Sequence, residues 1–399
     1  MFSKRSDWPA GQNLLSKALE EKKKFAQEIL DLTLSNPTLC GFEYLKNPAF
    51  QNLNDAKNIL YEPDPHGLLA ARQAITGYYA GKNIEVLPEQ IFLTSSTSEA
   101  YSFLFRLLAD PQDTILAPRP GYPLFDHLSQ INDLTLEQYP LSYEASWRLQ
   151  EEALKPFLKS SPKALIWVNP NNPTGNYACP AEIKMLNQFS ARHSCPLIAD
   201  EVFLDFSWNG DEARQSFAGN HQTLTFTLSG ISKILGLPQM KLSWIVVSGP
   251  RNQRGEAIRR LEIISDAYLS VNSLVQHALA SWLDGRQAVI SEILSRVGAN
   301  RAKLVELAQM DSNISVLNAQ GGWYAVLRLD GISDELFCLD LLTEKNLLVH
   351  PGYLFDFWEE NYLVISLLLP QERFAAGIEK LIIWSRNGEK SKINGTGAS

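Results

Sequence analysis

The apolar runs and polar turns of this chain converge on one stretch, residues 229 to 244, which reads Ser229-Gly230-Ile231-Ser232-Lys233-Ile234-Leu235-Gly236-Leu237-Pro238-Gln239-Met240-Lys241-Leu242-Ser243-Trp244. Lys233 stands among small and apolar neighbours, and a Gly/Pro turn leads to the second lysine, Lys241. An amine forms a Schiff base only when it is partly deprotonated, and an apolar setting lowers the pKa of a lysine. The stretch therefore indicates a reactive lysine at position 233, with a solvated surface lysine as the alternative.

Outward from this stretch, short apolar runs alternate with helical patterns along the chain. A helix is predicted over 98–108, and strands are predicted over 91–94, 114–117, 164–168, 196–199, 224–228 and 243–248. Strands that are apolar on both faces and separated by helices are typical of α/β folds. The predicted fold class is therefore α/β, with a mostly parallel central sheet.

Polar and conformationally special residues gather where these predicted strands end. They occupy the segments 95–97, 119–122, 169–175 and 229–233, and Asp200 stands alone after the fourth strand. In open α/β sheets, ligands bind beyond the carboxyl ends of the strands. The clustering therefore predicts one ligand site at this edge of the sheet.

The chain of 399 residues is long enough for two domains with a substantial core. We expect a large ligand-binding domain over 46–285, a linking helix over 286–310 and a small α+β domain over 311–386. Strand-like pieces of that small domain are predicted over 323–329, 347–350 and 362–368. An N-terminal segment over 1–45 is expected to pack with the small domain. Residues 387–399 are polar and rich in Gly, Ser and Lys, so a flexible tail is expected there.

Composition narrows the class of partner and the compartment. The formal net charge is -8, which disfavours a nucleic-acid-binding surface. The four cysteines lack CxxC spacing, so neither a disulfide framework nor a metal site is expected. The start of the chain does not resemble a signal peptide, and no apolar run reaches membrane-spanning length. A cytoplasmic protein without membrane contact is expected.

Two of the polar segments carry groups that suit a heterocyclic ligand. The loop 169–175 reads Asn-Pro-Asn-Asn-Pro-Thr-Gly, and its two prolines stiffen the backbone around the asparagine amides. A plain turn is the alternative, since these residues all favour turns. Asp200 follows a buried strand, where an ionised carboxylate needs a partner such as a protonated pyridine nitrogen. A capping or ion-paired aspartate is an equally acceptable interpretation.

The order of motifs along the chain resembles that of the class I/II aminotransferases. The motifs are NPNNPTG at 169–175, DEVF at 200–203 and SGISK at 229–233, followed by a basic residue before Leu-Ser-Trp. Residues 34–38, 61–72 and 118–123 resemble further motifs of that family. These are fold-type I enzymes that use pyridoxal 5'-phosphate (PLP). The resemblance extends over nearly the whole chain, and it implies a large PLP-binding domain, a smaller α+β domain and a transaminase activity.

The resemblance assigns a role to each matching residue around the cofactor ring. Lys233 is expected to be the Schiff-base lysine and the proton shuttle between the substrate Cα and the cofactor C4'. Asp200 is expected to face the pyridinium nitrogen, and Asn172 to donate to the ring 3-oxygen. Tyr122 is expected to stack on the ring, with a core tyrosine as the alternative.

The phosphate is expected at the start of the predicted helix, where backbone amides and hydroxyls meet. The residues concerned are Ser96, Thr97 and Ser98. Simple helix capping by the same residues is the alternative. Lys241 stands where the family usually has an arginine, and a lysine lacks the bidentate fork. The resemblance also implies that Tyr61 and Ser270 reach the phosphate of a neighbouring subunit, so a homodimer with shared sites is expected.

Besides Lys241, the chain departs from the family pattern at four further positions. Phe203 replaces a tyrosine that bonds the 3-oxygen, so the pKa of the Schiff base is expected to be higher than usual. Gly230 replaces a serine of the phosphate site, for which Ser229 or Ser232 are possible substitutes. Ser96 replaces a glycine. Val364 replaces the arginine that forks the substrate α-carboxylate.

Loss of that arginine bears on the substrate, because a bidentate contact in a dry site is worth on the order of 2–5 kcal/mol. Either another cation replaces it or the substrate lacks a carboxylate there. Arg119 is the candidate replacement, with a surface arginine as the alternative. Asn36 and Tyr324 are the other candidates for substrate contact.

The predicted function is a PLP-dependent aminotransferase that moves an amino group from an amino acid to a 2-oxo acid by a ping-pong mechanism. A PLP-dependent lyase or decarboxylase is the alternative, and Val364 favours it slightly. The ring stabilises any Cα carbanion, so the same fold serves all three chemistries. A PLP-sensing regulator is disfavoured because no helix-turn-helix pattern is present, and a dinucleotide-binding protein because no GxGxxG follows a strand.

Overall fold

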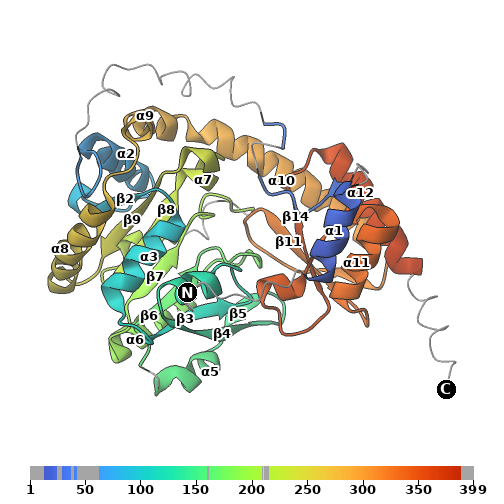
Figure 1. Ribbon diagram of the computed structural model, residues 1–399, viewed down its shortest axis with the longest axis horizontal. Coiled ribbons are helices and arrows are strands. Elements are labelled where there is room, and N and C mark those ends of the chain that lie inside the picture. The colour runs from blue at the N-terminus through green and yellow to red at the C-terminus, as the bar shows by residue number, and fades with distance from the viewer. Residues whose placement is uncertain are drawn as a thin grey trace.

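The computed structural model describes residues 13–24, 29–36, 40–42, 63–159, 161–208, 210 and 215–387. These residues form two main sheets, one of eight strands and one of four. Figure 1 shows the long helix α10 (Arg286–Ala308) running from the side of the large sheet to the side of the small one. The predicted α/β class is confirmed.

The large sheet has the strand order β2-β9-β8-β7-β6-β3-β4-β5. In that order the strands are Ile91–Thr94, Ser243–Ser248, Thr225–Gly230, Leu197–Asp200, Ala164–Val168, Thr114–Arg119, Thr135–Tyr143 and Trp147–Leu149. The five from β8 to β4 pair in parallel, while β9 is antiparallel to both of its neighbours and β5 is antiparallel to β4. All six predicted strands are present; β4 was not predicted because it is half-exposed and has no continuous apolar run.

Both faces of the large sheet are covered, which explains why its inner strands are apolar throughout. In β6, Ile166 belongs to a core with α8, whereas Leu165 and Trp167 belong to a core with α6. The helices of this part are α2 (Leu69–Ala80), α3 (Thr97–Leu108), α4 (Phe125–Ile131), α5 (Glu151–Leu154), α6 (Pro180–His193), α7 (Ile231–Ile234), α8 (Arg251–Tyr268) and α9 (Ser273–Asp284).

The small sheet has the order β10-β11-β14-β13 and is antiparallel throughout. Its strands are Ile314–Val316, Tyr324–Leu329, Tyr362–Ser366 and His350–Pro351, and the helices beside it are α11 (Asp334–Lys345) and α12 (Gln371–Asn387). The predicted strand over 347–350 is divided, because Leu347–Leu348 (β12) pairs with Leu30–Asp31 (β1) instead. Figure 1 shows α1 (Leu14–Lys24) beside α11, where Lys22 Nζ donates to the Thr343 carbonyl at 2.6 Å.

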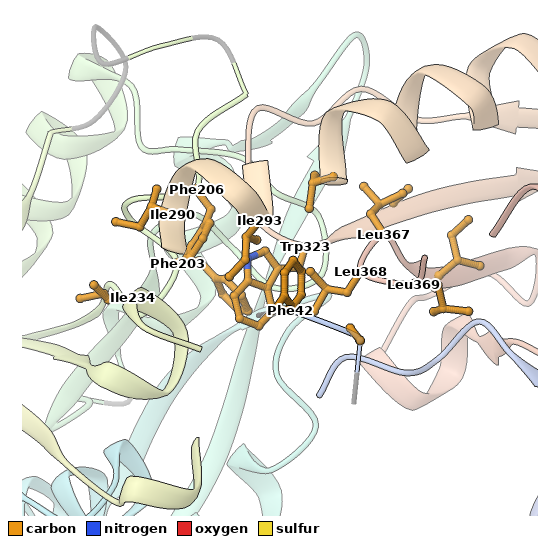
Figure 2. Close-up of a cluster of buried hydrophobic side chains, with 14 of the residues drawn as sticks. Phe42, Phe203, Phe206, Ile234, Ile290, Ile293, Trp323, Leu367, Leu368 and Leu369 are labelled. Carbon is orange, nitrogen blue, oxygen red and sulfur yellow. The ribbon is translucent and has the colours of Figure 1, made fainter. Parts of the chain in front are cut away.

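Aromatic side chains join the two parts directly behind the predicted lysine. Figure 2 shows Phe203 and Phe206, from the segment after β7, against Trp323 at the start of β11, with Ile290 and Ile293 of α10 in the same cluster. The ring centroids of Phe203 and Trp323 lie 5.2 Å apart. This contact places the edge of the small sheet over the carboxyl ends of the large-sheet strands.

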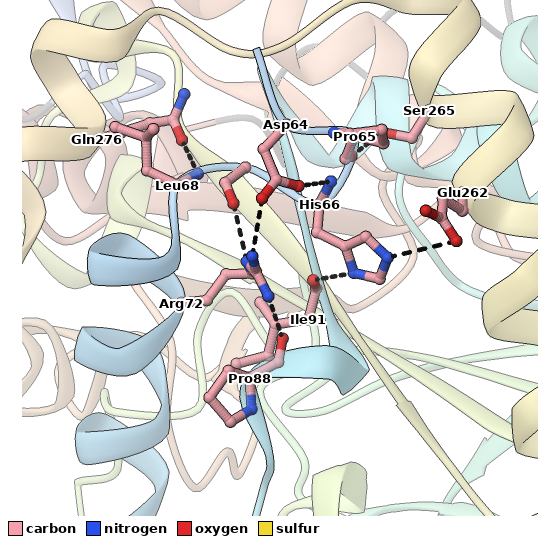
Figure 3. A network of polar contacts seen from close by, with 11 residues as sticks. Asp64, Pro65, His66, Leu68, Arg72, Pro88, Ile91, Glu262, Ser265 and Gln276 are labelled. Atoms are coloured by element: carbon pink, nitrogen blue, oxygen red, sulfur yellow. Dashed lines mark hydrogen bonds and ion pairs between the residues drawn. The ribbon is translucent and has the colours of Figure 1, made fainter. Parts of the chain in front are cut away.

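A polar network holds the chain that enters α2 (Figure 3). Arg72 donates from Nε to the Gly67 carbonyl at 2.8 Å, and its other nitrogens reach Asp64 Oδ2 at 2.9 Å and the Pro88 carbonyl at 3.2 Å. The His66 ring lies between the Ile91 carbonyl and α8. Gly67 has φ +89, which a residue with a side chain rarely adopts. The segment 64–72 is thereby fixed to β2 and α8.

None of the described helices combines the length and hydropathy of a membrane span.

Candidate active site

Lys233 faces a cavity of about 120 Å³ at the carboxyl edge of the large sheet. The cavity is lined by the ends of β6 and β7, by α7 directly after β8, by the starts of α3 and β9, and by Tyr324 of the small sheet. Its lining residues are Thr97, Tyr122, Val168, Asn172, Asp200, Val202, Phe203, Ser232, Lys233, Ser243 and Tyr324. Six of the predicted site residues therefore meet in one place, although the sequence separates them by up to 227 positions (324 − 97).

The amine of Lys233 is held in an aromatic setting. Its Nζ lies 5.2 Å from the centroid of the Phe203 ring and 5.0 Å from that of Trp323. Burial lowers the pKa of Lys233 from 10.5 to about 8, and the nearby Asp200 carboxylate opposes part of that shift. At pH 7 roughly a tenth of the amine is then neutral, against less than about a thousandth for an ordinary lysine. Lys233 can therefore act as a nucleophile and as a base.

Asp200 ends β7 and is held by two donors. Tyr101 Oη donates to Oδ2 at 2.9 Å, and the Val202 amide donates to Oδ1 at 3.2 Å. Burial raises the Asp200 pKa to about 6, while these hydrogen bonds and Lys233 pull it down. The group is thus mostly ionised at neutral pH and can accept a proton or an N–H from a ligand. Tyr101 was missed from the sequence, because it resembles the other inward-facing residues of its helix.

Asn172 stands on a loop that is tied down by its neighbour. Asn171 Nδ2 donates to the Pro120 carbonyl at 3.0 Å and to Thr174 Oγ1 at 2.8 Å, which joins the loop to the segment after β3. The Asn172 amide lines the cavity, and its Oδ1 is buried with no partner among the described residues. A buried amide without a protein partner is costly unless a ligand satisfies it.

Tyr122 and Tyr324 bring two phenols to the cavity. Burial raises the Tyr122 pKa to about 12, so its hydroxyl stays neutral, and its ring meets Phe125 edge-on at 5.6 Å. Burial also raises the Tyr324 pKa, and Tyr324 hydrogen bonds with Ser35 of the N-terminal segment. Both phenols can donate to an anion in the cavity.

The predicted phosphate segment is divided by the structure. Thr97 opens α3 and lines the cavity, whereas Ser96 is the N-cap and its Oγ accepts from the Glu99 amide at 3.1 Å. Ser98 lies outside the cavity lining. The hydroxyl of Ser96 therefore caps the helix, as the alternative interpretation expected. The first amides of α3 lie at the end of the helix that borders the cavity. Ser232 and Ser243 add two further hydroxyls; Ser243 was not predicted.

Other candidates lie outside the cavity lining. Arg119 donates from Nε to the Asp356 carbonyl at 2.6 Å, and its guanidinium lies 3.6 Å from the centroid of the Trp358 ring. Lys241 is exposed and has φ 50. Asn36 is exposed and Ser270 is half-buried. Tyr61 falls within 43–62, outside the described residues. The roles given to these residues stay predictions.

Position 364 is part of an apolar core. Val364 is fully buried in β14, opposite Val326 of β11 and His350 of β13. Strand alternation puts it on the same sheet face as Tyr324, since Tyr324 and Val326 are two residues apart. The surrounding cluster includes Phe355 and Phe357. The place of the expected arginine is therefore filled with hydrocarbon.

Comparison with known proteins agrees with this geometry. A family model described as aminotransferase class I and II matches residues 29–381. A glutamate-pyruvate aminotransferase AlaA from Haemophilus influenzae is 26% identical over 371 residues, covering 91% of each chain. An alanine aminotransferase from Mycobacterium tuberculosis is 28% identical, over 88% of this chain and 84% of its own.

Solved structures show the same fold. An alanine aminotransferase from Pyrococcus furiosus superposes with a TM-score of 0.88 at 21% identity, covering 97% of this chain and all of its own. A tyrosine aminotransferase from Leishmania infantum gives a TM-score of 0.83 at 21% identity, over 96% and 99%. These relatives are similar to the chain and are named as aminotransferases, which supports that activity over the lyase or decarboxylase alternative. Because the family model spans most of the sequence and the cavity brings its motifs together, the chain belongs to the class I and II aminotransferase family.

Proposed function

We propose that this aminotransferase uses PLP and moves an amino group between a small amino acid and a 2-oxo acid, with alanine or glutamate as donor and pyruvate as an acceptor. One observation carries the proposal: the Lys233 amine, with a pKa near 8, shares a cavity with the Asp200 carboxylate. The printed names of the relatives, glutamate-pyruvate and alanine aminotransferase, support the choice of substrates.

The residues of the cavity fit such a cofactor. The Asn172 side-chain amide lines the cavity, where its Nδ2 can donate to a ligand, and the Asp200 carboxylate beside it is buried yet largely ionised. PLP, when bound, supplies an aldehyde for the amine and a ring that withdraws electrons from the substrate Cα. Asp200 would hold a proton on the ring nitrogen, Asn172 would donate to the 3-oxygen, and Tyr122 would line the ring.

Lys233 would then transfer the proton between the substrate and the cofactor. Its Nζ would take the proton from the substrate Cα as a general base and deliver it to C4' of the cofactor as a general acid, and in the second half-reaction the same transfer would run in reverse. The rings of Phe203 and Trp323 confine the amine and exclude water from it. Of the proposed substrate contacts Asn36, Arg119 and Tyr324, Tyr324 has the strongest support because it lines the cavity.

A homodimer is part of the proposal. Ile263 and Leu269 of the α8 region are 65% and 68% exposed, and they lie close in sequence to Ser270. Burial of these two side chains against a second copy of the chain would remove apolar surface from water. Ser265 of the same helix donates to the Pro65 carbonyl at 2.6 Å, which ties the segment following Tyr61 to α8. Tyr61 and Ser270 are proposed to reach the phosphate of the partner. A cytoplasmic location is proposed from the four unpaired cysteines.

The half-reaction tests the function. Purified protein loaded with PLP is mixed with alanine, glutamate or a panel of amines, without any 2-oxo acid. The absorbance band of the bound cofactor should convert to that of pyridoxamine 5'-phosphate, with one equivalent of pyruvate or 2-oxoglutarate formed. Lys233→Ala should give no conversion. Release of ammonia, or an unchanged spectrum with every donor, would contradict the proposal.

A further inference from the structure

The Ser243 side chain lies where a side chain at position 230 would be. Gly230 ends β8 and lies directly opposite Ser243, the first residue of the antiparallel strand β9. A Cβ atom added to Gly230 would lie 2.4 Å from Ser243 Oγ and 2.9 Å from Ser243 Cβ. Real Cβ contacts are not this short, so the Ser243 side chain occupies the volume that a side chain at 230 would need. The same Cβ atom would also lie 3.0 Å from the Leu242 carbonyl oxygen, so a side chain at 230 requires the Ser243 side chain to move.

The Ser243 hydroxyl faces the cavity. Ser243 is 2% exposed, lines the cavity with Thr97 and Ser232, and pairs on its other side with Thr94 of β2. Strand β2 leads into α3, so Ser243 lies beside the chain that enters this helix. The Ser243 side chain is therefore placed where its hydroxyl can donate to a ligand acceptor in the cavity.

The other hydroxyl considered for this place is turned away. Ser229 is adjacent to Gly230 in β8, so its side chain is on the opposite face of the sheet. Its Oγ is buried without a partner among the described residues and does not line the cavity. Thr227, two positions earlier, shares that face and also has an unpartnered buried Oγ1. Neither can meet a ligand beside Thr97.

Charge at this end of the cavity comes from the helix rather than from Lys241. That side chain is exposed and lies outside the cavity lining. The helix α3 has twelve residues, and the amides of Thr97 and Ser98 come before the Glu99 amide that Ser96 Oγ caps, so these two can bind an anion. A dianion can be held by such neutral donors together with hydroxyls.

We propose that Ser243 is a phosphate-binding residue, whose Oγ donates to the phosphate of the cofactor from the place that a residue-230 side chain would otherwise fill. This proposal rests on the proposed use of PLP. Gly230 stands where the family usually has a serine, and the proposal is that Ser243, on the neighbouring strand β9, supplies the hydroxyl of that serine. The phosphate is then bound by hydroxyls of Ser243, Ser232 and Thr97 and by amides of α3.

Binding measurements on the full chain, freed of cofactor, test this inference. Dissociation constants are measured for PLP and for pyridoxal, which lacks the phosphate, by quenching of tryptophan fluorescence. Ser243→Ala should weaken PLP binding about tenfold or more, the scale of a hydrogen bond to a charged group. Pyridoxal binding should change less than about twofold, because only the phosphate contact is lost. Thr227→Val is the matched control and should leave both constants unchanged.

An exchange of the two residues provides the second variant. Gly230→Ser alone should weaken PLP binding strongly, because its side chain meets Ser243. Gly230→Ser combined with Ser243→Gly should restore PLP affinity to within about threefold of the original, since one hydroxyl again fills the shared space. This rescue shows that the position of the hydroxyl matters even if the single variant folds poorly.

Three outcomes would overturn the inference: an equal loss for PLP and pyridoxal in Ser243→Ala, no loss for either, or the loss appearing in Ser229→Ala instead. These outcomes are distinct from failure of the proposed function, in which the unaltered protein would bind no PLP. Protection by inorganic phosphate gives an independent readout, because phosphate should raise the melting temperature of the unaltered protein more than that of Ser243→Ala.

Discussion

At the residue scale, the site depends on two buried groups whose pKa values approach each other. The pKa of Lys233 is lowered to about 8 and the pKa of Asp200 is raised to about 6, in both cases chiefly because the group is buried. Each shift has a consequence that can be measured on the cofactor-free protein.

Lys233 should react with an aldehyde at a lower pH than ordinary lysines. Only the neutral amine attacks, so the rate of reaction with pyridoxal should rise with pH and level off above about 8. Stopped-flow absorbance between pH 6 and pH 10 measures the profile, and Lys233→Ala gives the background from other lysines. A midpoint near 10.5 would show that the amine is solvated.

Asp200→Asn should stabilise the cofactor-free protein near neutral pH while removing activity. The folded-state pKa is raised, so the folded protein keeps this proton up to about pH 6, whereas the unfolded chain releases it near 3.8. Ionised Asp200 therefore destabilises the fold above that range, by about 1–3 kcal/mol at most.

The asparagine variant should gain stability at pH 7.5 and lose the advantage below about pH 4. Urea unfolding at the two pH values measures the difference. Equal effects at both pH values would mean that the change is steric rather than electrostatic.

At the element scale, the packing of the small sheet suits a valine at position 364, where the family usually has an arginine. In β14, Val364 packs with Phe355 and Phe357 on the face that carries Tyr324. An arginine at this position would enter a mainly apolar cluster, with His350 opposite it on β13.

Val364→Arg should therefore destabilise the protein by about 3 kcal/mol or more, because the charge is buried without a partner. Val364→Leu, which keeps the site apolar, should cost less than about 1.5 kcal/mol. Urea midpoints compare the two variants. If Val364→Arg instead keeps full stability and lowers the KM for alanine, the strand has room for the arginine and the packing explanation is wrong.

At the scale of the whole molecule, the proposed homodimer would use the exposed side chains Ile263 of α8 and Leu269, which follows this helix. Ile263 and Leu269 are largely exposed, whereas the apolar residues that line the active-site cavity are buried or half-buried.

Ile263→Asp combined with Leu269→Asp should shift a dimer to monomers, because two charges would enter an apolar contact. Sedimentation velocity measures the change, and cofactor affinity should fall with it if Tyr61 and Ser270 act across subunits. Leu336→Asp is the matched control, since Leu336 is 59% exposed on α11 of the small sheet region. A dimer that survives the double change but not the control would place the interface elsewhere.

The fold and the reactive lysine were predictable because their signals are local. Continuous apolar runs mark strands buried on both faces, and polar turns mark the ends of those strands. The motif order around Asn172, Asp200 and Lys233 identified the family for the same reason. Strand β4 was missed, and 347–350 was taken as one strand, because half-exposed or short pairings leave little periodicity.

The sequence by itself determined the α/β class and the family, and its motifs predicted that Asn172, Asp200 and Lys233 would lie together, since spacing and residue type record them within a few positions. Only the tertiary structure decided that Tyr101 supports Asp200 across 99 positions and that Arg119 turns to Asp356 across 237. The structure also decided that Ser243 fills the space beside Gly230. The physical reason is that steric exclusion and hydrogen bonding act between neighbours in space, whose distance along the chain leaves no periodic trace.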